Sequence, residues 1–364
     1  MTQQDELVIR SRAPLRLGLC GGGTDVSPYC DQHGGAVLNL TIDQYAYTTI
    51  EPTTDDRVTF CASDTNQVFE SDGVEAMEIA EPLALHRATY RRIMRQFNHG
   101  EARPCRITTF CDAPPGSGLG TSSTMVVSMV KAYVEWLNLP LGEYEIAHLA
   151  FEIERLEVGL QGGRQDQYAA TFGGVNFMEF HANDRVVVNP LRIKNWIVSE
   201  LEMSLVLFNS GQSRSSAAII TEQTDNVRNR RGTTLHALHE LKLDAYQMKD
   251  CLLRGDFERL AAVMRKTWDD KKQLADSVTN SHINTVMRAA FAAGAQAGKV
   301  TGAGGGGYII FLVAPQRRMD VIHALRQQER GQVMTCHLTR HGSQGWKILP
   351  PFTPPQIGSM LALR

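Results

Sequence analysis

The sequence predicts an α+β fold in two domains, and three observations lead to this class. Candidate antiparallel strands come first and a long helix follows, unlike the regular βαβ alternation of a doubly wound sheet. At 364 residues the chain is long enough for two separate cores. Its apolar content of 43% is typical of a globular protein. We expect an N-terminal domain over residues 1–197 and a C-terminal domain over residues 198–364, with the boundary near 195–202.

Charge and cysteine usage exclude several classes of protein. The net charge is −2, and the short arginine clusters are explained better by solvated helix faces than by a nucleic-acid surface. The seven cysteines form no CxxC pair, which predicts free thiols in a reducing cytoplasm. The polar N-terminus lacks an apolar signal core. The sequence contains no run of about 18 apolar residues, so we expect no membrane span. The sequence leaves open whether the chain self-associates.

The first strands of the chain surround a glycine-rich loop. Residues 7–13 are expected to form a strand that ends in a tight turn at Pro14. Residues 16–25 then read RLGLCGGGTD, in which three adjacent glycines precede Thr24 and Asp25. A carboxylate after such a loop can accept hydrogen bonds from two sugar hydroxyls. The alternative is an Asx-type turn in which Asp25 caps only backbone.

The next elements lead to the central stretch. Val, Ile, Thr and Tyr are frequent in residues 36–50, which predicts a strand. Further strands are expected over 57–61 and 104–111, and helical spacing predicts a helix over 81–97.

Residues 114–124 read PPGSGLGTSST and precede an apolar run, 125–137, without Gly or Pro. Alternating glycines let backbone N–H groups approach an anion, and the first turn of a helix favours the same anion. The four hydroxyls can cap the helix or reach a Mg²⁺ carried by phosphates. No Lys precedes Thr121, which excludes a Walker A loop, and the glycine spacing excludes a dinucleotide fingerprint. The alternative is an N-capped helix without a ligand.

A second amphipathic helix is expected over residues 141–159. In its second half, Glu152, Glu154 and Glu157 predict a solvated face, or one of them points at a phosphate-bound metal. A glycine-rich segment then delivers Asp166 to the start of a short helix, close after Arg164. Such a carboxylate can orient or deprotonate an attacking hydroxyl. The alternative is a carboxylate that only stabilises the helix N-terminus.

A hairpin is expected over 175–180 and 185–189, before the domain boundary, and a strand over 203–208 after it. A polar loop, 209–216, brings Arg214 and several serines to a helix start, where they grip an anion or cap the helix. Helices are expected over 234–253, 257–275 and 283–297. Asp256 is the expected N-cap of the second. On that helix we expect Trp268 in the core and both Lys271 and Lys272 in solvent. The alternative for these two lysines, and for Arg214, is a basic site for a phosphate that the substrate already carries.

A third glycine-rich loop, KVTGAGGGG over residues 299–307, precedes a strand over 308–313. The loop formally contains GxGxxG, but a strand follows where a dinucleotide fold would place a helix. So many glycines indicate a backbone that lies against another backbone or a ligand. A final core strand is expected over 332–339.

The three loops PLRLGLCGGGTD, PPGSGLGTSS and KVTGAGGGG, in this order, resemble those of the GHMP kinases, which include galactokinase and mevalonate kinase. The resemblance covers residues 8 to about 313. Within this family, residues 10–29, 154–174 and 210–216 are most similar to the bacterial D-glycero-D-manno-heptose 7-phosphate kinases.

The resemblance implies a ribosomal protein S5 domain 2-like N-terminal domain, a ferredoxin-like C-terminal domain and a site between them. It implies Asp166 as the catalytic aspartate, assisted by Arg16, and Mg²⁺ held by Ser122 and Glu154. The residues implied to bind ATP are Pro115, Gly116, Ser117, Gly118, Leu119, Gly120, Thr121, Ser122 and Ser123. Those implied to bind the substrate are Gly22, Gly23, Thr24, Asp25, Gly163, Arg164, Arg214, Gly304 and Gly305.

The activity implied by this resemblance is ATP-dependent phosphorylation of a sugar hydroxyl. The substrate would be D-glycero-D-manno-heptose 7-phosphate, phosphorylated at its anomeric oxygen to the 1,7-bisphosphate on the way to nucleotide-activated heptose for surface polysaccharide. One alternative is another sugar 1-kinase, such as an L-fucokinase. A second is a non-catalytic member of the fold, which we expect to have lost Asp166 or the hydroxyls of residues 121–124.

Overall fold

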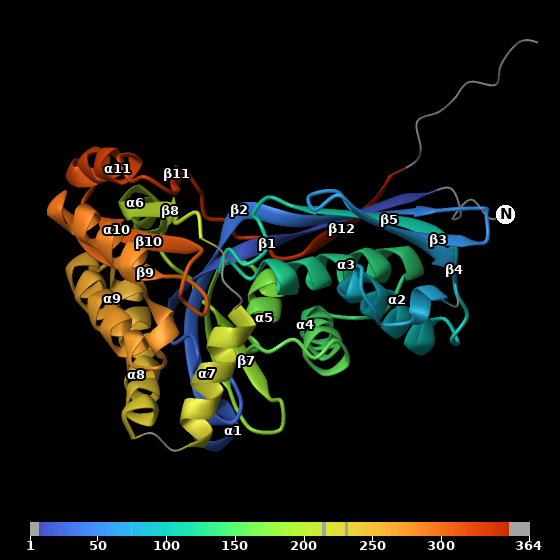
Figure 1. The fold of residues 1–364 in the computed structure, drawn as a ribbon, viewed down its shortest axis with the longest axis horizontal. Coiled ribbons are helices and arrows are strands. Elements are labelled where there is room, and N and C mark those ends of the chain that lie inside the picture. Colours follow the sequence, from blue (N-terminus) through green and yellow to red (C-terminus); the bar gives the residue numbers. More distant parts are fainter. Residues whose placement is uncertain (1–6, 74, 213–215, 230–231, 349–364) are drawn as a thin grey trace, which may run out of the picture.

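The structure is a computed structural model that describes residues 7–73, 75–212, 216–229 and 232–348. It confirms the α+β class, with two sheets and their helices arranged along the long axis of the molecule (Figure 1). The larger sheet occupies one part of the molecule with α2 to α5 below it, and the smaller sheet lies with α8 to α11 in the other part.

The larger sheet has strand order β12-β1-β2-β5-β3-β4, with β6 paired to β2 and β7 paired to β6. Its pairs are antiparallel except β3 with β5. The strands are β1 Val8–Cys20, β2 Gly35–Pro52, β3 Arg57–Ala62, β4 Gln67–Asp72, β5 Cys105–Cys111, β6 Val175–Phe180, β7 Val186–Pro190 and β12 Gln344–Ile348.

The first strand does not turn at Pro14, so that expectation is wrong. β1 continues to Cys20, and Pro14 pairs with Tyr45 just before a register shift to the pair Arg16–Thr41. A bulge tolerates proline because it leaves backbone groups outside the ladder, and it also bends the strand. The strand therefore carries Arg16 and the first glycine loop directly to the site.

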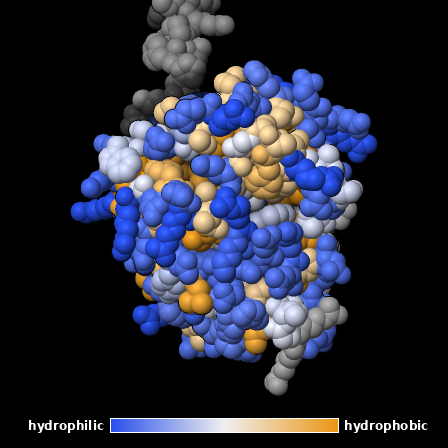
Figure 2. Space-filling view, turned by 90° about the vertical axis from the view of Figure 1, so that its left-hand side faces the viewer, coloured by the Kyte–Doolittle hydropathy of each residue, from blue (hydrophilic) through white to orange (hydrophobic). Residues whose placement is uncertain are grey.

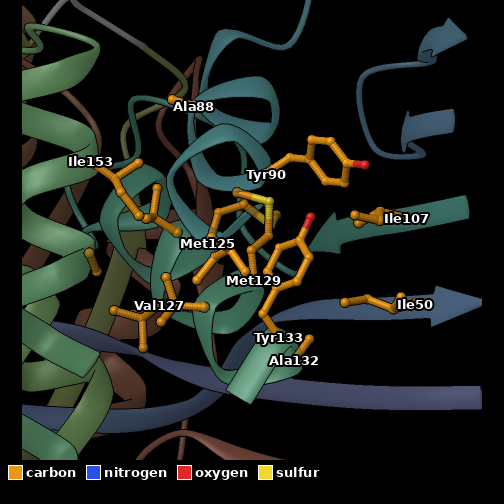
Figure 3. Close-up of a cluster of buried hydrophobic side chains, with 14 of the residues drawn as sticks. Ile50, Ala88, Tyr90, Ile107, Met125, Val127, Met129, Ala132, Tyr133 and Ile153 are labelled. Carbon is orange, nitrogen blue, oxygen red and sulfur yellow. The ribbon is translucent and has the colours of Figure 1, made fainter. Parts of the chain in front are cut away.

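Helix α3, Thr121–Leu137, is the central helix of the larger part. It packs on β1 and β2, and its apolar side chains meet those of β2, β5 and α2 in one core (Figure 3). Each such side chain stabilises the fold by about 1.5–3 kcal/mol when buried. This packing fixes the position of the helix N-terminus, which opens onto the site. The neighbouring helices are α1 Tyr29–His33, α2 Ala84–Phe97, α4 Glu143–Phe151 and α5 Gln165–Phe172.

The smaller sheet has strand order β11-β8-β10-β9 and is antiparallel throughout. Its strands are β8 Leu205–Asn209, β9 Ala295–Val300, β10 Tyr308–Val313 and β11 Gln332–Met334. The helices of this part are α6 Asn195–Ser204, α7 Ser216–Arg228, α8 Gly232–Arg254, α9 Phe257–Lys272, α10 Ser281–Ala292 and α11 Arg318–Arg326. The Asp256 carboxylate accepts from the Arg259 N–H at 3.0 Å, so the expected N-cap of α9 is confirmed. Figure 2 views this end of the molecule, which is hydrophilic over most of its surface.

Three other expectations about elements need correction. The helix expected over 283–297 ends at Ala292, because Gly294 has φ +110° and leads into β9. The core strand expected over 332–339 is the three-residue edge strand β11, and the chain then returns to the larger sheet as β12. The helix expected over 141–159 is α4 followed by a π-helical turn, Glu152–Glu157.

One hydrophobic core joins the two parts of the molecule. Leu15, Leu17 and Leu19 of β1 pack in the same cluster as Leu207 of β8 and Ile310 of β10. The boundary expected near 195–202 falls within α6. Across the described ranges, no helix combines the length and apolar character needed to cross a bilayer.

Candidate active site

The three glycine-rich loops and helices α3, α5, α7 and α9 surround a cavity of about 420 Å³. The first loop contributes Gly22 and Gly23, and the third loop contributes Gly302. The central loop contributes the residues from Gly116 to Ser123, except Ser117 and Leu119, which are buried. Segments from both sheets therefore meet at one site, as the resemblance implies.

The central loop keeps its backbone open toward the cavity. Gly116, Gly118 and Gly120 have φ of 75°, 76° and 80°, a conformation that L side chains rarely adopt. Gly120 is the N-cap of α3, and no side chain caps this helix, so the hydroxyl-cap alternative is wrong. The N–H groups of the first turn are left without intrahelical partners, which suits an anion. Thr121 and Ser122 line the same cavity.

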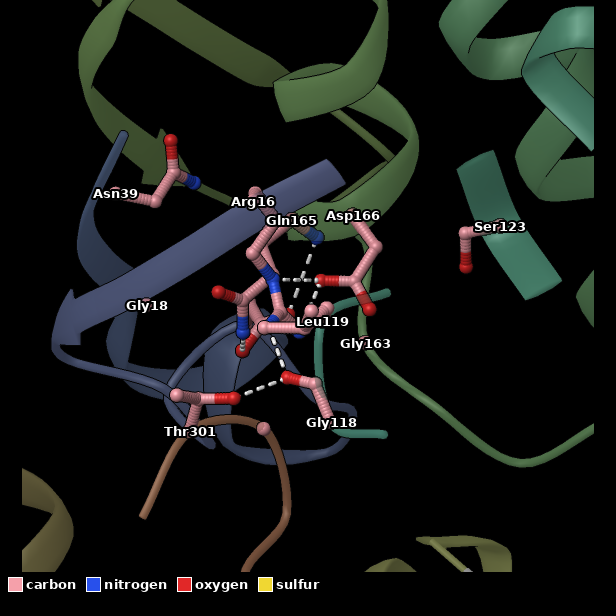
Figure 4. A network of polar contacts seen from close by, with 12 residues as sticks. Arg16, Gly18, Asn39, Gly118, Leu119, Ser123, Gly163, Gln165, Asp166 and Thr301 are labelled. Atoms are coloured by element: carbon pink, nitrogen blue, oxygen red, sulfur yellow. Dashed lines mark hydrogen bonds and ion pairs between the residues drawn. The ribbon is translucent and has the colours of Figure 1, made fainter. Parts of the chain in front are cut away.

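The third loop supports the central loop from behind. The Tyr308 N–H donates to the Ser117 carbonyl at 2.9 Å, and the Thr301 hydroxyl donates to the Gly118 carbonyl (Figure 4). A Cβ built on Gly302 would lie 2.9 Å from Gly118 Cα, and one on Gly307 would lie 2.2 Å from the Ser117 carbonyl oxygen. These glycines let the two backbones touch, which confirms the close approach expected there.

Asp166 lies at the N-terminus of α5 and is held by Arg16 of β1. Arg16 Nε and Nη2 both contact Asp166 Oδ1, at 2.7 and 2.6 Å, while Nη1 donates to the Gly118 carbonyl at 2.6 Å (Figure 4). Both contacts go to Oδ1, so Arg16 does not bind Oδ2 of the carboxylate. The central loop comes so close that a Cβ built on Gly120 would lie 3.2 Å from Oδ2. One arginine thus ties the carboxylate to the loop at fixed distance.

Glu154 projects from the π-helical turn into the cavity wall beside α3. The side chain of Glu154 is 1% exposed, and burial raises its pKa. Gln167 donates to its Oε2 at 2.7 Å, and Arg155 Nη1 lies 3.2 Å from Oε1. Glu152 and Glu157, by contrast, pair with Arg92 on the far side of the turn. A buried carboxylate and the Ser122 hydroxyl in one cavity are the oxygen donors that Mg²⁺ prefers.

The first glycine loop ends at Asp25, which is buried and well bonded. Its carboxylate accepts from the Gly23 N–H, the Gln165 N–H and the Gln165 side chain, at 3.1–3.2 Å. A Cβ built on Gly163 would lie 1.9 Å from Oδ2, so only glycine fits there. Three of roughly four acceptor positions are in use, which leaves room for one hydroxyl from the cavity.

Several residues expected to contact the substrate lie behind the cavity wall. Arg164 pairs with Asp184 at 2.5 Å and with Asp31 at 3.6 Å. Thr24 bonds the Gly21 and Ala36 carbonyls. Gly304 packs against Val278, and the Gly305 N–H donates to the Val278 carbonyl. These residues shape the loops that form the wall. Arg214 lies outside the described residues.

The solvent position expected for Lys271 is wrong, whereas its alternative role as a substrate-binding lysine stays a prediction. Lys271 is 3% exposed and lines the cavity, while its neighbour Lys272 is partly exposed and pairs with Asp269. The apolar periodicity of α9 does not distinguish two adjacent lysines near the end of the helix. The one signal in the sequence is that Lys271 lies three residues after Trp268, so both side chains share the buried face.

Comparison with known proteins agrees with this geometry. The sequence profile described as GHMP kinases N terminal domain matches residues 84–174, and the one described as GHMP kinases C terminal matches residues 248–330. The chain is 45% identical over 340 residues to D-glycero-alpha-D-manno-heptose 7-phosphate kinase of Campylobacter jejuni subsp. jejuni, covering 93% of this chain and 99% of that protein.

Two further relatives bear on the substrate. The crystal structure of a D-glycero-D-manno-heptose 1-phosphate kinase from Bacteroides thetaiotaomicron superposes with a TM-score of 0.80 at 44% identity, covering 93% of this chain and 99% of that one. An L-fucokinase/L-fucose-1-P guanylyltransferase of Bacteroides fragilis is 27% identical over 84% of this chain and 34% of its own length.

Proposed function

This chain belongs to the GHMP kinases and is an ATP-dependent kinase, and we propose that its acceptor is the anomeric hydroxyl of D-glycero-D-manno-heptose 7-phosphate. The product would be the 1,7-bisphosphate, which leads to nucleotide-activated heptose for surface polysaccharide. Support for the substrate comes from the 45% identity to the Campylobacter jejuni enzyme over nearly the full length of both chains.

The observation that carries the proposed chemistry is the position of Asp166 beside the central loop. The loop's free N–H groups bind the ATP phosphates, and Asp166 Oδ2 accepts the hydrogen bond of the attacking hydroxyl. Arg16 fixes this carboxylate against the loop, so that the hydroxyl and the terminal phosphate are held together. Asp25 accepts a second sugar hydroxyl.

Ser122 and Glu154 would hold Mg²⁺, which neutralises charge on the ATP phosphates when it is bound. Gln167 donates to the Glu154 carboxylate and orients it toward the cavity. Arg155 balances the charge of this carboxylate and also bonds the Gly163 carbonyl at 3.3 Å, which holds the wall segment 160–163 in place.

The test is ADP release over a panel of sugars with and without an existing phosphate. The panel contains D-glycero-D-manno-heptose, its 7-phosphate and its 1-phosphate, D-mannose and L-fucose. We expect the highest kcat/KM for the 7-phosphate, with a new anomeric phosphate in the product. A preference for the 1-phosphate would instead move the reacting hydroxyl to the other end of the sugar.

The second candidate is an L-fucose 1-kinase, favoured by the 27% identity to the Bacteroides fragilis protein. Its sugar carries no phosphate, so a kcat/KM for L-fucose above that for the heptose 7-phosphate would select this candidate.

A further inference from the structure

Lys271 is a buried cation at the acceptor end of the cavity, which we define as the part lined by Gly22, Asp25, Gln165, Asp166 and Lys271. The side chain comes from the last turn of α9 and reaches between the first and third glycine loops. Its Nζ donates to the Gly302 carbonyl, and a Cβ built on Gly22 would lie 3.8 Å from Nζ. Lysine is rarely buried because an ammonium loses much hydration, so this position calls for a partner.

In the part of the chain that the structure describes, the protein supplies only one hydrogen-bond acceptor for this ammonium group, the Gly302 carbonyl. Among the described residues, no carboxylate lies within ion-pair distance of Lys271, and its hydrogen bond to Gly302 uses one of three ammonium protons. The charged groups that face it are Arg16 of β1 and Lys299 of β9, which repel it, and Asp25 and Asp166, which attract it from a distance; the Cys20 thiol also faces it. Burial, with Arg16 next, lowers its pKa to about 8, so the ammonium stays mostly protonated at pH 7.

Resting on the function proposed above, we propose that Lys271 binds the acceptor sugar, donating to an oxygen next to the hydroxyl that Asp166 engages. Asp166 and Asp25 are acceptors, and both bond hydroxyl protons. Lys271 is the complementary donor, since it offers protons to an oxygen lone pair. The sugar then donates hydrogen bonds to the two carboxylates and accepts one from the ammonium group, which fixes the direction of the attacking hydroxyl.

The binding role differs from a purely structural tie to Gly302. A structural lysine would affect ATP and sugar alike, because Gly302 supports the central loop. A sugar ligand affects the sugar alone. The pH dependence separates the two further. With a pKa of about 8, the ammonium loses its proton as the pH rises through 8. The binding role predicts that kcat/KM for the sugar falls in that range while KM for ATP stays constant, whereas a structural role predicts that both change.

The test compares Lys271→Met with Lys272→Met, which removes the adjacent, partly exposed lysine. For Lys271→Met we expect KM for the sugar to rise about 10- to 100-fold, as for loss of a hydrogen bond to a charged group. KM for ATP should change less than threefold, and the alkaline fall should disappear. Lys272→Met should match the wild type. Equal KM values for the sugar in both variants would overturn the proposal.

Two measures keep the test decisive. If Lys271→Met does not fold, Lys271→Gln and Lys271→Arg are compared, and the arginine should restore sugar binding more than the glutamine. The sugar used is the panel member with the highest wild-type kcat/KM. If that sugar is not the heptose 7-phosphate, the proposed substrate fails, while the ratio of variant to wild type still decides the role of Lys271. If the wild type acts on none of the sugars, both proposals fail.

Discussion

Gly120→Ala should uncouple the central loop from Asp166. Gly120 has φ +80°, where an L side chain costs about 1–2 kcal/mol of unfolding free energy. The new Cβ would also lie 3.1–3.3 Å from three atoms of the Asp166 side chain. The Asp166 side chain or the loop must then move by a few tenths of an ångström. Because a misplacement of about 1 Å costs about 100-fold in turnover, we expect this smaller shift to lower kcat by about 3- to 10-fold, with a modest loss of stability.

Gly100→Ala provides the matched control. Gly100 has φ +81°, and nothing lies within 4 Å of a Cβ built there. It follows α2 and does not line the cavity. Gly100→Ala should therefore lose only the backbone cost of about 1–2 kcal/mol in urea and keep its turnover. Gly120→Ala should lose at least as much unfolding free energy, and only this variant should lose turnover in an ADP-release assay. Equal kcat values for the two variants would refute the argument that the loop and the carboxylate are in steric contact.

Three further predictions follow from the site and the core. Asp166→Asn should lower kcat by at least about 1,000-fold while ATP still binds, measured by calorimetry and ADP release; near-wild-type turnover would remove this carboxylate from its role. Ser122→Ala should raise the Mg²⁺ concentration needed for half-maximal rate, and an unchanged Mg²⁺ titration would exclude this hydroxyl as a ligand. Burial lowers the pKa of His86 to about 4, below the 6.5 of an unfolded histidine, so the unfolded chain binds the extra proton first and stability falls as the pH drops from 6.5 toward 4. Between pH 7 and pH 5 this group should cost about 2 kcal/mol of unfolding free energy, and His86→Gln should lose less over the same range; equal losses in urea titrations would contradict it.

The sequence alone was enough for most local structure. The apolar run 125–137 after a glycine turn is helical as its pattern indicates, and the helix begins four residues earlier, at Thr121. The N-cap of α9 at Asp256 is equally local, because the capping oxygen and the N–H that it binds are three residues apart. The three glycine loops were found as motifs, and the structure brings them to one cavity.

Elements that depend on distant partners were not predictable in the same way. β12 is a strand because β1 offers an edge to pair with, more than 300 residues earlier in the chain. β1 passes through Pro14 because a bulge against β2 removes the need for its missing N–H. Neither condition can be read from the residues of the strand itself.

The composition, the spacing of glycines and the apolar periodicity determined the fold class, the loops and Asp166 as a candidate carboxylate, while the resemblance to the GHMP kinases singled out Arg16. Only the tertiary structure decided which side chains face the cavity. Arg164 turns to Asp184, and Lys271 is buried while Lys272 is not, since burial depends on what another part of the chain packs against a residue. Periodicity describes one element at a time, whereas a site between two sheets is defined by contacts that no single element contains.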